Sequence, residues 1–199
     1  MLVVPCLGPG STGPNVATLV SVRHLIAIAG PIGAGKSSVA ERVALLAQSS
    51  GLSVSLVGLD EVAFAQRADL GLDEFWHRAG VAHSALVRGW FDAGADVVIA
   101  HGPFFESDSY ESLMAAAPSG ARRHHVLLDA PFDVALDRVV SDPERTRTAL
   151  SVQPDFLRST HEAFAALVES LPRVDLTVDT AGLTADEVAH SVFALLNLP

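Results

Sequence analysis

The sequence predicts an α/β fold in which helices cover both faces of one parallel sheet. Two observations support this prediction. Short apolar runs alternate with longer segments of helical periodicity, and a glycine-rich loop joins the first apolar run to the first helical segment. In such a fold the crossovers are right-handed and ligands bind where the parallel strands end. The chemistry is therefore expected directly after each strand.

Each element follows from its own pattern of apolar residues. Short runs rich in apolar residues predict five strands at residues 25–29, 54–58, 96–100, 125–128 and 175–178. Apolar residues at helical spacing predict helices beginning near Lys36, then at residues 73–93, 132–140, 154–171 and 184–196. The helix at 73–93 is expected to turn five side chains inward: Phe75, Ala79, Ala82, Leu86 and Trp90.

The length and the composition predict a single domain. The chain has 199 residues and is 49% hydrophobic, which is enough for one substantial core. Residues 1–22 are rich in Gly, Pro, Ser and Thr and are expected to form a loose leader. Residues 23–199 are then the one folded domain, and catalysis should not depend on the leader.

The loop at residues 30–37 matches the complete pattern G-x-x-x-x-G-K-[ST]. Glycines let its backbone N–H groups turn inward around a phosphate, and the following helix adds its positive N-terminus. Lys36, the only lysine in the chain, is expected to reach the β- and γ-phosphates of ATP, and the Ser37 hydroxyl to bind Mg²⁺. A glycine-rich turn that binds nothing is the alternative. The predicted ATP-binding residues of this segment are Gly30, Pro31, Ile32, Gly33, Ala34, Gly35, Lys36, Ser37 and Ser38.

Polar and aromatic residues follow the later strands. Asp60, after the second strand, is the candidate base for an acceptor hydroxyl and a candidate Mg²⁺ ligand; its alternative role is to cap the helix beginning at Glu61. His101, after the third strand, is a candidate substrate contact. Aromatic side chains are candidates for an apolar acceptor pocket, although they could also be core residues: Phe64, Trp76, Phe104 and Phe105. His124 and His125 point to opposite faces of a strand, so no zinc site is predicted.

A lid is predicted near residues 141–153, where a polar, proline-interrupted segment follows a helix. Three arginines lie in this region: Arg138, Arg145 and Arg147. A lid arginine can stabilise charge on a transferred phosphoryl group, and another can stack on adenine. The alternative is a solvated helix end in which Arg138 pairs with Asp142 or Glu144.

Charge, cysteine content and hydropathy exclude several classes of protein. The net charge is −10 and no basic run occurs, which argues against a nucleic-acid partner. A single cysteine, Cys6, indicates a reducing compartment such as the cytoplasm. No apolar run reaches the ~20 residues of a membrane span, and the N-terminus lacks the basic region of a signal peptide.

Taken with these motifs, the chain after residue 23 resembles the small P-loop kinases of the nucleoside-monophosphate, shikimate and chloramphenicol phosphotransferase kind. The stretches 144–153, 160–162 and 178–180 resemble the chloramphenicol phosphotransferase branch most. The resemblance implies a three-layer α/β/α sandwich of the P-loop NTPase class, with strand order 2-3-1-4-5 and a short lid. It also implies that Asp60 is the base, that Arg138 with Arg145 or Arg147 serves the nucleotide and lid site, and that the turn after Thr180 lies near adenine.

The sequence departs from this family at the end of the third strand, where Ala100-His101 replaces the acidic residue of many relatives. Asp60 would then serve both as the base and as the Mg²⁺ ligand, or Asp129 would assist. Monophosphate kinases use several arginines to hold the acceptor phosphate, and here the expected acceptor region contains only Arg67, Arg78 and Arg88. This favours an uncharged, hydroxyl-bearing acceptor over a nucleotide.

The leading hypothesis is an ATP-dependent kinase, with Mg²⁺, that phosphorylates a hydroxyl of a small metabolite or antibiotic-like molecule; its catalytic residues would be Lys36, Asp60 and Arg145. The alternatives are a nucleoside or nucleotide kinase, and a non-catalytic ATP-binding sensor or drug-sequestering protein. A GTPase is disfavoured because an N-K-x-D motif needs a second lysine. The sequence leaves open whether the protein is a monomer or a homodimer.

Overall fold

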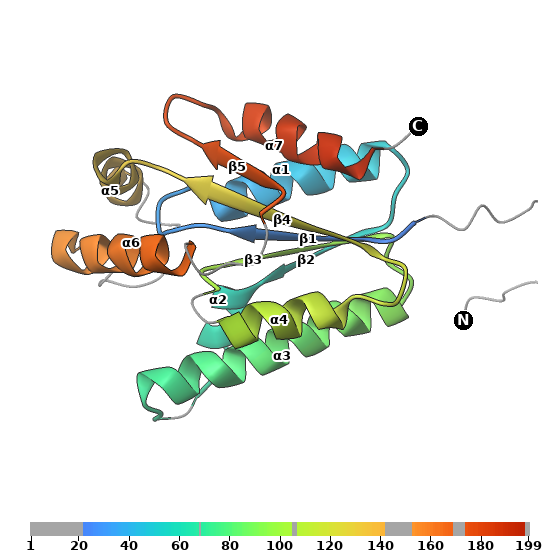
Figure 1. Ribbon diagram of the computed structural model, residues 1–199, viewed down its shortest axis with the longest axis horizontal. Coiled ribbons are helices and arrows are strands. Elements are labelled where there is room, and N and C mark those ends of the chain that lie inside the picture. Colours follow the sequence, from blue (N-terminus) through green and yellow to red (C-terminus); the bar gives the residue numbers. More distant parts are fainter. Residues whose placement is uncertain (1–21, 68, 105–106, 142–152, 169–173, 198–199) are drawn as a thin grey trace, which may run out of the picture.

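The computed structural model describes residues 22–67, 69–104, 107–141, 153–168 and 174–197. Within these ranges, five strands form one parallel sheet in the order β2-β3-β1-β4-β5, which confirms the predicted fold class and order (Figure 1). The strands are β1 His24–Ala29, β2 Val54–Gly58, β3 Val97–Gly102, β4 Arg122–Asp129 and β5 Leu176–Asp179. Each overlaps its predicted range, and β4 extends beyond the predicted 125–128 at both ends.

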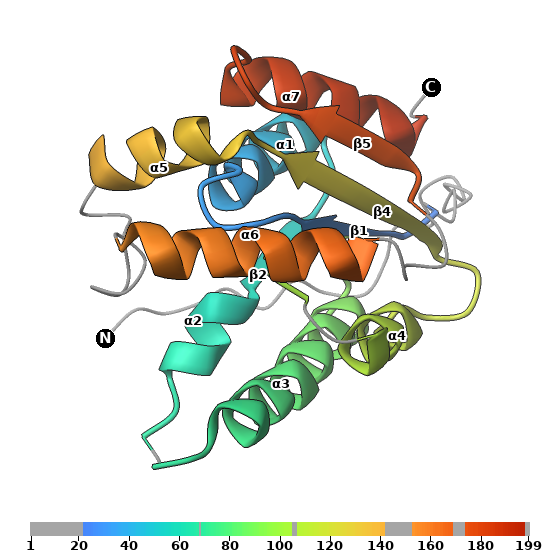
Figure 2. The ribbon, with the colours of Figure 1, turned by 60° about the vertical axis from the view of Figure 1, so that its left-hand side comes forward.

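Helices lie on both faces of this sheet. They are α1 Lys36–Ser49, α2 Leu59–Phe64, α3 Leu72–Asp92, α4 Ser107–Ala116, α5 Phe132–Ser141, α6 Pro154–Val168 and α7 Ala185–Phe193. Helices α1 and α7 cover one face, whereas α3 and α4 cover the other (Figure 1). Helices α5 and α6 lie toward the carboxyl ends of the strands (Figure 2). The sequence pattern did not predict α4, and the predicted closing helix ends as a 3-10 turn at Ala194–Leu196.

The central strand β1 is buried along its whole length and separates two cores. Leu25 and Ala27 belong to the core under α3 and α4, whereas Ile26 and Ile28 belong to the core under α1 and α7. This alternation is the period of two expected of a strand that is covered on both faces. His101 on β3 pairs with Ile28 on β1 and with Gly58 on β2, so the carboxyl ends of these three strands lie side by side.

Helix α3 has the predicted length, but the side chains that it buries are not those predicted. Ala79 is buried as expected and Phe75 is half-buried, whereas Ala82 is exposed and Leu86 and Trp90 are 47% and 46% exposed. The buried stripe instead includes four other residues of the same helix: Gly80, His83, Val87 and Phe91. The buried face differs from the predicted one because apolar residues lie on both sides of the helix. His83 can be buried because its Nε2 is hydrogen-bonded to the carbonyl oxygen of Val57, at 3.0 Å.

Several expectations fall on residues that are not described. Residues 1–21 of the predicted leader at 1–22 and residues 142–152 of the predicted lid at 141–153 lie outside the described ranges, and so do Phe105, Arg145 and Arg147. None of the described helices is long and apolar enough to cross a membrane.

Two histidines meet near the amino-terminal ends of β1 and β4, away from the phosphate-binding loop. The rings of His24 on β1 and His124 on β4 stack at 5.3 Å between centroids, and His24 Nδ1 lies 3.0 Å from His124 Nε2. Only one of these two nitrogens can carry the proton, so the ring that accepts the hydrogen bond must be neutral. Burial, and then the charges of His124 and Arg122, lower the pKa of His24 to about 4.

This pair predicts a loss of stability in acid. The unfolded chain protonates His24 near its ordinary pKa while the folded chain does not, so the free energy of unfolding falls as the pH drops from about 6.5 to about 4. The expected loss from this group is about 1–2 kcal/mol, discounted for screening at the edge of the sheet. Urea unfolding at several pH values should be less pH-dependent in His24→Gln. If the free energy of unfolding changed equally with pH in His24→Gln and in the native protein, this account would be contradicted.

Candidate active site

The loop after β1 is shaped by glycines that approach other backbone groups closely. Gly33 and Gly35 have φ angles of 82° and 89°, which residues with a side chain rarely adopt. A Cβ on Gly30 would lie 2.5 Å from the carbonyl oxygen of Leu128, and a Cβ on Gly33 would lie 2.7 Å from that of Ala135. The loop therefore packs against β4 and α5 in a way that requires glycine. The described first turn of α1 has no acidic side chain, so its positive end is left for an anion.

Lys36 is buried at the start of α1, and its ammonium lies inside this loop. Its Nζ donates a hydrogen bond to the carbonyl oxygen of Pro31 at 2.8 Å. Burial lowers the pKa of Lys36, and the nearby charge of Asp60 acts against this shift. The ammonium is thus poorly solvated, a state that a bound polyphosphate would improve.

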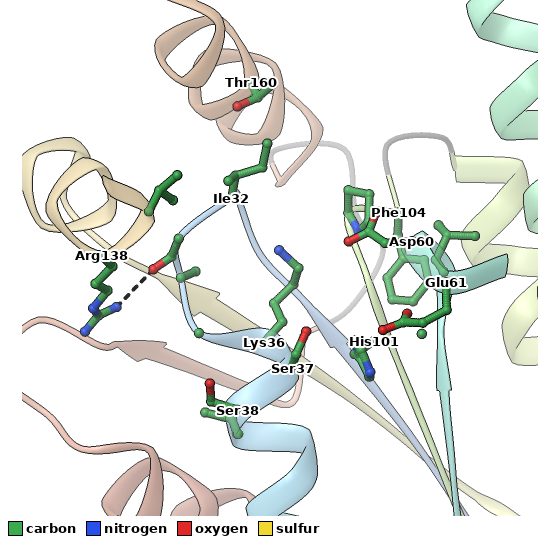
Figure 3. A pocket seen from close by; sticks show the side chains of 18 of the residues that line it. Ile32, Lys36, Ser37, Ser38, Asp60, Glu61, His101, Phe104, Arg138 and Thr160 are labelled. Atoms are coloured by element: carbon green, nitrogen blue, oxygen red, sulfur yellow. Dashed lines mark hydrogen bonds between the residues drawn. The ribbon is translucent and has the colours of Figure 1, made fainter. Parts of the chain in front are cut away.

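Asp60 faces Lys36 across the cleft. It is half-buried in the first turn of α2 and lines the same cleft as Lys36 and Ser37 (Figure 3). The alternative in which Asp60 caps a helix beginning at Glu61 is wrong, because α2 begins at Leu59 and its N-cap is Gly58. The side chain of Asp60 is therefore directed to the cleft.

His101, Glu61 and Gly58 crowd together where β2 and β3 end. A Cβ on Gly58 would overlap the Glu61 carboxylate and lie 2.7 Å from His101 Cε1. Both side chains line the cleft, and His101 is only 8% exposed (Figure 3). Burial lowers the pKa of the neighbouring His83, with the hydrogen bond to Val57 acting against it. An acidic side chain thus adjoins the end of β3, although it comes from α2 and not from β3; sequence reasoning did not identify it.

Arg138 supports the outer side of the loop. Its guanidinium, labelled in Figure 3, donates to the carbonyl oxygen of Gly33 at 3.1 Å. It also donates to the hydroxyl and carbonyl oxygens of Thr180 at 2.9 and 2.7 Å. Thr180 Oγ1 in turn donates to the carbonyl oxygen of Asp129 at 2.9 Å. Arg138 is thus held by the loop and by the end of β5, and is not the solvated side chain of the alternative interpretation. It lines the cleft beside Thr180 and Thr184.

The described residues enclose one large cleft of about 1720 Å³. Of the predicted loop residues, Ile32 through Ser38 line it, while Gly30 and Pro31 lie behind as buried support. Among the predicted acceptor residues, the structure brings four to the cleft: Phe64, Trp76, His101 and Phe104. Arg88 is exposed on α3 and does not line the cleft, so its predicted role in substrate contact is not supported. The Asp129 carboxylate accepts from the backbone N–H of Ala130 and does not line the cleft either.

Helix α6 contributes a contact that the sequence did not reveal. A ring nitrogen of His161, Nε2, lies 2.9 Å from the carbonyl oxygen of Ile32 in the loop. The His161 ring packs edge-on against Phe132, over which the Arg158 guanidinium lies at 4.1 Å. No sequence pattern pairs two residues so far apart, because the contact depends on how α6 crosses the carboxyl ends of the strands.

His161 is expected to position the loop for its ligand. His161→Ala removes the donor to Ile32, which should weaken ATP binding about threefold to tenfold, the loss of roughly one hydrogen bond. Isothermal titration calorimetry measures this effect. His190→Ala is the matched control, since His190 is exposed on α7 and bonds only to its own helix among the contacts described. Equal ATP affinities of His161→Ala and the native protein would refute the positioning role.

The residues present fit a magnesium ion bound together with phosphates. Ser37 and Asp60 offer a hydroxyl and a carboxylate oxygen to the same cleft, and Mg²⁺ prefers such ligands together with phosphate oxygens and water. Within the described ranges, no group of three or more His, Cys, Asp or Glu side chains could hold a metal by itself. An ion here would therefore depend on the phosphates of its ligand.

Comparisons with known proteins agree with this architecture. An APS kinase from Mycobacterium tuberculosis, solved with AMPPNP and APS, superposes with a TM-score of 0.63 at 17% identity, covering 89% of this chain and 99% of that one. A tunicamycin resistance protein from Deinococcus radiodurans gives 0.60 at 18% identity, covering 89% and 97%. A gluconokinase from Sinorhizobium meliloti gives 0.57 at 19% identity, covering 87% and 91%.

These identities are low, so the likeness concerns the fold, which is that of P-loop kinases. No curated protein matches the sequence significantly. A family model described as an AAA domain matches residues 25–169, which span β1, the phosphate-binding loop and most of the sheet. The chain therefore belongs to this AAA domain family.

Proposed function

We propose that the protein transfers the γ-phosphoryl group of ATP to a hydroxyl of a small molecule. The observation that carries the proposal is the meeting of Lys36 and Asp60 from opposite walls of one cleft (Figure 3). One wall is a phosphate-binding loop with a buried ammonium, and the other presents a carboxylate where an acceptor can enter. Phosphoryl transfer needs little more than positioning, a base and charge stabilisation.

The residues would divide these tasks between them. The backbone N–H groups of residues 33–37 and the Lys36 ammonium would hold the β- and γ-phosphates in line with the acceptor. The Asp60 carboxylate would accept the proton of the hydroxyl as its oxygen bonds to the γ-phosphorus and the bond to ADP breaks. Ser37 and Asp60 would hold Mg²⁺, which supplies neutralisation of phosphate charge.

The nucleotide base would lie on the side of the phosphate-binding loop that is away from Asp60. Thr180, Leu183 and Thr184 line the cleft there beside Arg138. This arrangement supports the predicted placement of adenine after Thr180. Arg145 and Arg147 remain predicted lid residues that stabilise the moving charge.

Two alternatives are retained. A nucleoside or nucleotide kinase would use the same loop and base, and the APS kinase among the similar structures was solved in complex with AMPPNP and APS. A sensor or sequestering protein would bind ATP without transfer. The resemblance to chloramphenicol phosphotransferases, the cytoplasmic location, the absence of a nucleic-acid partner and the choice between monomer and homodimer all remain predictions.

A screen for ADP release tests the proposal. Hydroxyl-bearing metabolites and antibiotics form one set of acceptors, and nucleosides with their monophosphates form the opposing set. We expect ADP release above the background hydrolysis rate with members of the first set, and a phosphorylated product of matching mass. ATP binding without acceptor-dependent ADP release in either set would contradict the kinase proposal and favour sequestration.

A further inference from the structure

The acceptor side of the cleft has an aromatic wall that begins one helical turn after Asp60. Phe64 follows Asp60 by four residues on α2, so both side chains lie on one face of that helix. The ring of Phe64 lies 6.1 Å from that of Phe75, which contacts Trp76 edge-on at 5.4 Å. These three rings line the cleft, and Phe64 is 39% exposed.

This wall is fixed in place and is not a loose cluster of side chains. Gln66 Nε2 donates to the carbonyl oxygen of Phe75 at 2.9 Å and thereby ties the end of α2 to the start of α3. Behind the wall, Phe104 is 3% exposed and has a φ angle of 34°, which is strained for a bulky residue. Such strain is maintained only where the surroundings impose it, often at binding sites.

The apolar lining continues along the outer side of α3. Leu86 and Trp90, which the sequence pattern assigned to the core, are about half exposed and line the same cleft. The two tryptophans of the chain therefore both lie on this cleft. An extended apolar body could lie against them while its hydroxyl remains near Asp60.

The charges on this side would repel an anion. Among the described residues that line the cleft, the lysine and arginine side chains are Lys36 and Arg138, both at the phosphate loop. The acceptor side instead presents carboxylates at Asp60, Glu61 and Asp73.

Two of the three arginines predicted for the acceptor region, Arg67 and Arg78, are engaged elsewhere. Arg67 donates to the carbonyl oxygens of Phe64 and Gln66 at 2.6 and 3.0 Å. Arg78 pairs with Glu74 on the same exposed helix face at 2.5 Å. Neither side chain is among those that line the cleft. Within the described ranges, an acceptor with a phosphate or carboxylate would therefore meet carboxylates on this side of the cleft without a compensating cation.

We infer that the acceptor is an alcohol without an anionic group whose hydroxyl is attached to a flat apolar body, and that Trp76 determines this specificity. The inference rests on the proposed function. The hydroxyl oxygen would bond to the γ-phosphorus, its proton would pass to Asp60, and ADP would leave. The aromatic wall would bind the apolar body, since stacking against aromatic rings adds to apolar burial.

Binding of matched alcohols in the presence of AMPPNP tests the inference separately from turnover. Phenylpropanediol is compared with glycerol, which lacks the apolar body, and with phenyllactate, which adds a carboxylate. Isothermal titration calorimetry is expected to give an affinity for phenylpropanediol at least about tenfold higher than for either comparison compound, because glycerol lacks the aromatic contact and the carboxylate of phenyllactate would meet like charges.

Variants of α3 identify the wall. Trp76→Ala should weaken phenylpropanediol binding about fivefold to tenfold, while Trp76→Phe keeps most of it and ATP affinity stays unchanged in both. Val81→Ala is the control, since Val81 is 58% exposed on the same helix and does not line the cleft. Tighter binding of phenyllactate, no binding of phenylpropanediol, or an unaffected Trp76→Ala would overturn the inference. Binding without ADP release would support the acceptor class and contradict phosphoryl transfer.

Discussion

Replacing Lys36 by alanine is expected to lower phosphoryl transfer by about 100-fold to 1000-fold, the usual effect of removing one charge aimed at the reacting group. The ammonium is buried in the loop, where its described hydrogen bond goes to Pro31 rather than to a carboxylate. Its stabilising partner would thus be the polyphosphate. Steady-state kinetics with an acceptor found in the ADP-release screen measure the loss.

The fold should survive this substitution. Burial already disfavours the charged form of Lys36, so its removal should leave the midpoint of thermal unfolding equal or higher. Lys36→Arg is the matched variant: it keeps the charge but replaces a compact ammonium by a planar fork, and we expect it not to restore transfer. A folded Lys36→Ala protein with native turnover would remove the loop from the mechanism.

Asp60→Asn is expected to lower turnover by about 100-fold to 10,000-fold, the range for loss of a positioned base. ATP affinity should change little, because removing a negative charge near the triphosphate and replacing one candidate Mg²⁺ ligand act in opposite directions. Turnover and calorimetric titration with ATP distinguish these two effects.

Asp92→Asn provides the control for this variant. Asp92 is an exposed carboxylate at the end of α3 and does not line the cleft, so both measurements should match the native protein. A sequestering protein would behave alike with Asp or Asn at position 60. That outcome would reject Asp60 as the base and, with it, the proposed chemistry.

The sheet was predictable because its strands are short apolar runs separated by turn residues. The five strands and the loop after β1 appear where the pattern placed them. The inner face of α3 was not predictable, since apolar residues occur on both of its sides. Burial of His83 is decided by the Val57 carbonyl on a neighbouring strand, a tertiary contact that helical periodicity does not encode.

Part of the candidate site could likewise be predicted from local sequence patterns, and part could not. The residues of the loop and Asp60 could be predicted because a local motif and a strand end place them directly. The contacts of Arg138 with Thr180 and of His161 with Ile32 join residues far apart in the chain, so only the fold reveals them. Arg88 does not line the cleft, and helical periodicity alone does not reveal which side of α3 faces it.

A crystal structure with magnesium and AMPPNP would show where the triphosphate binds. We expect the β- and γ-phosphates inside residues 30–37, with the Lys36 ammonium moved from Pro31 to their oxygens and the Asp60 carboxylate facing the γ-phosphoryl group. A nucleotide bound elsewhere, with that loop empty, or an Asp60 side chain turned out of the cleft, would contradict this expectation.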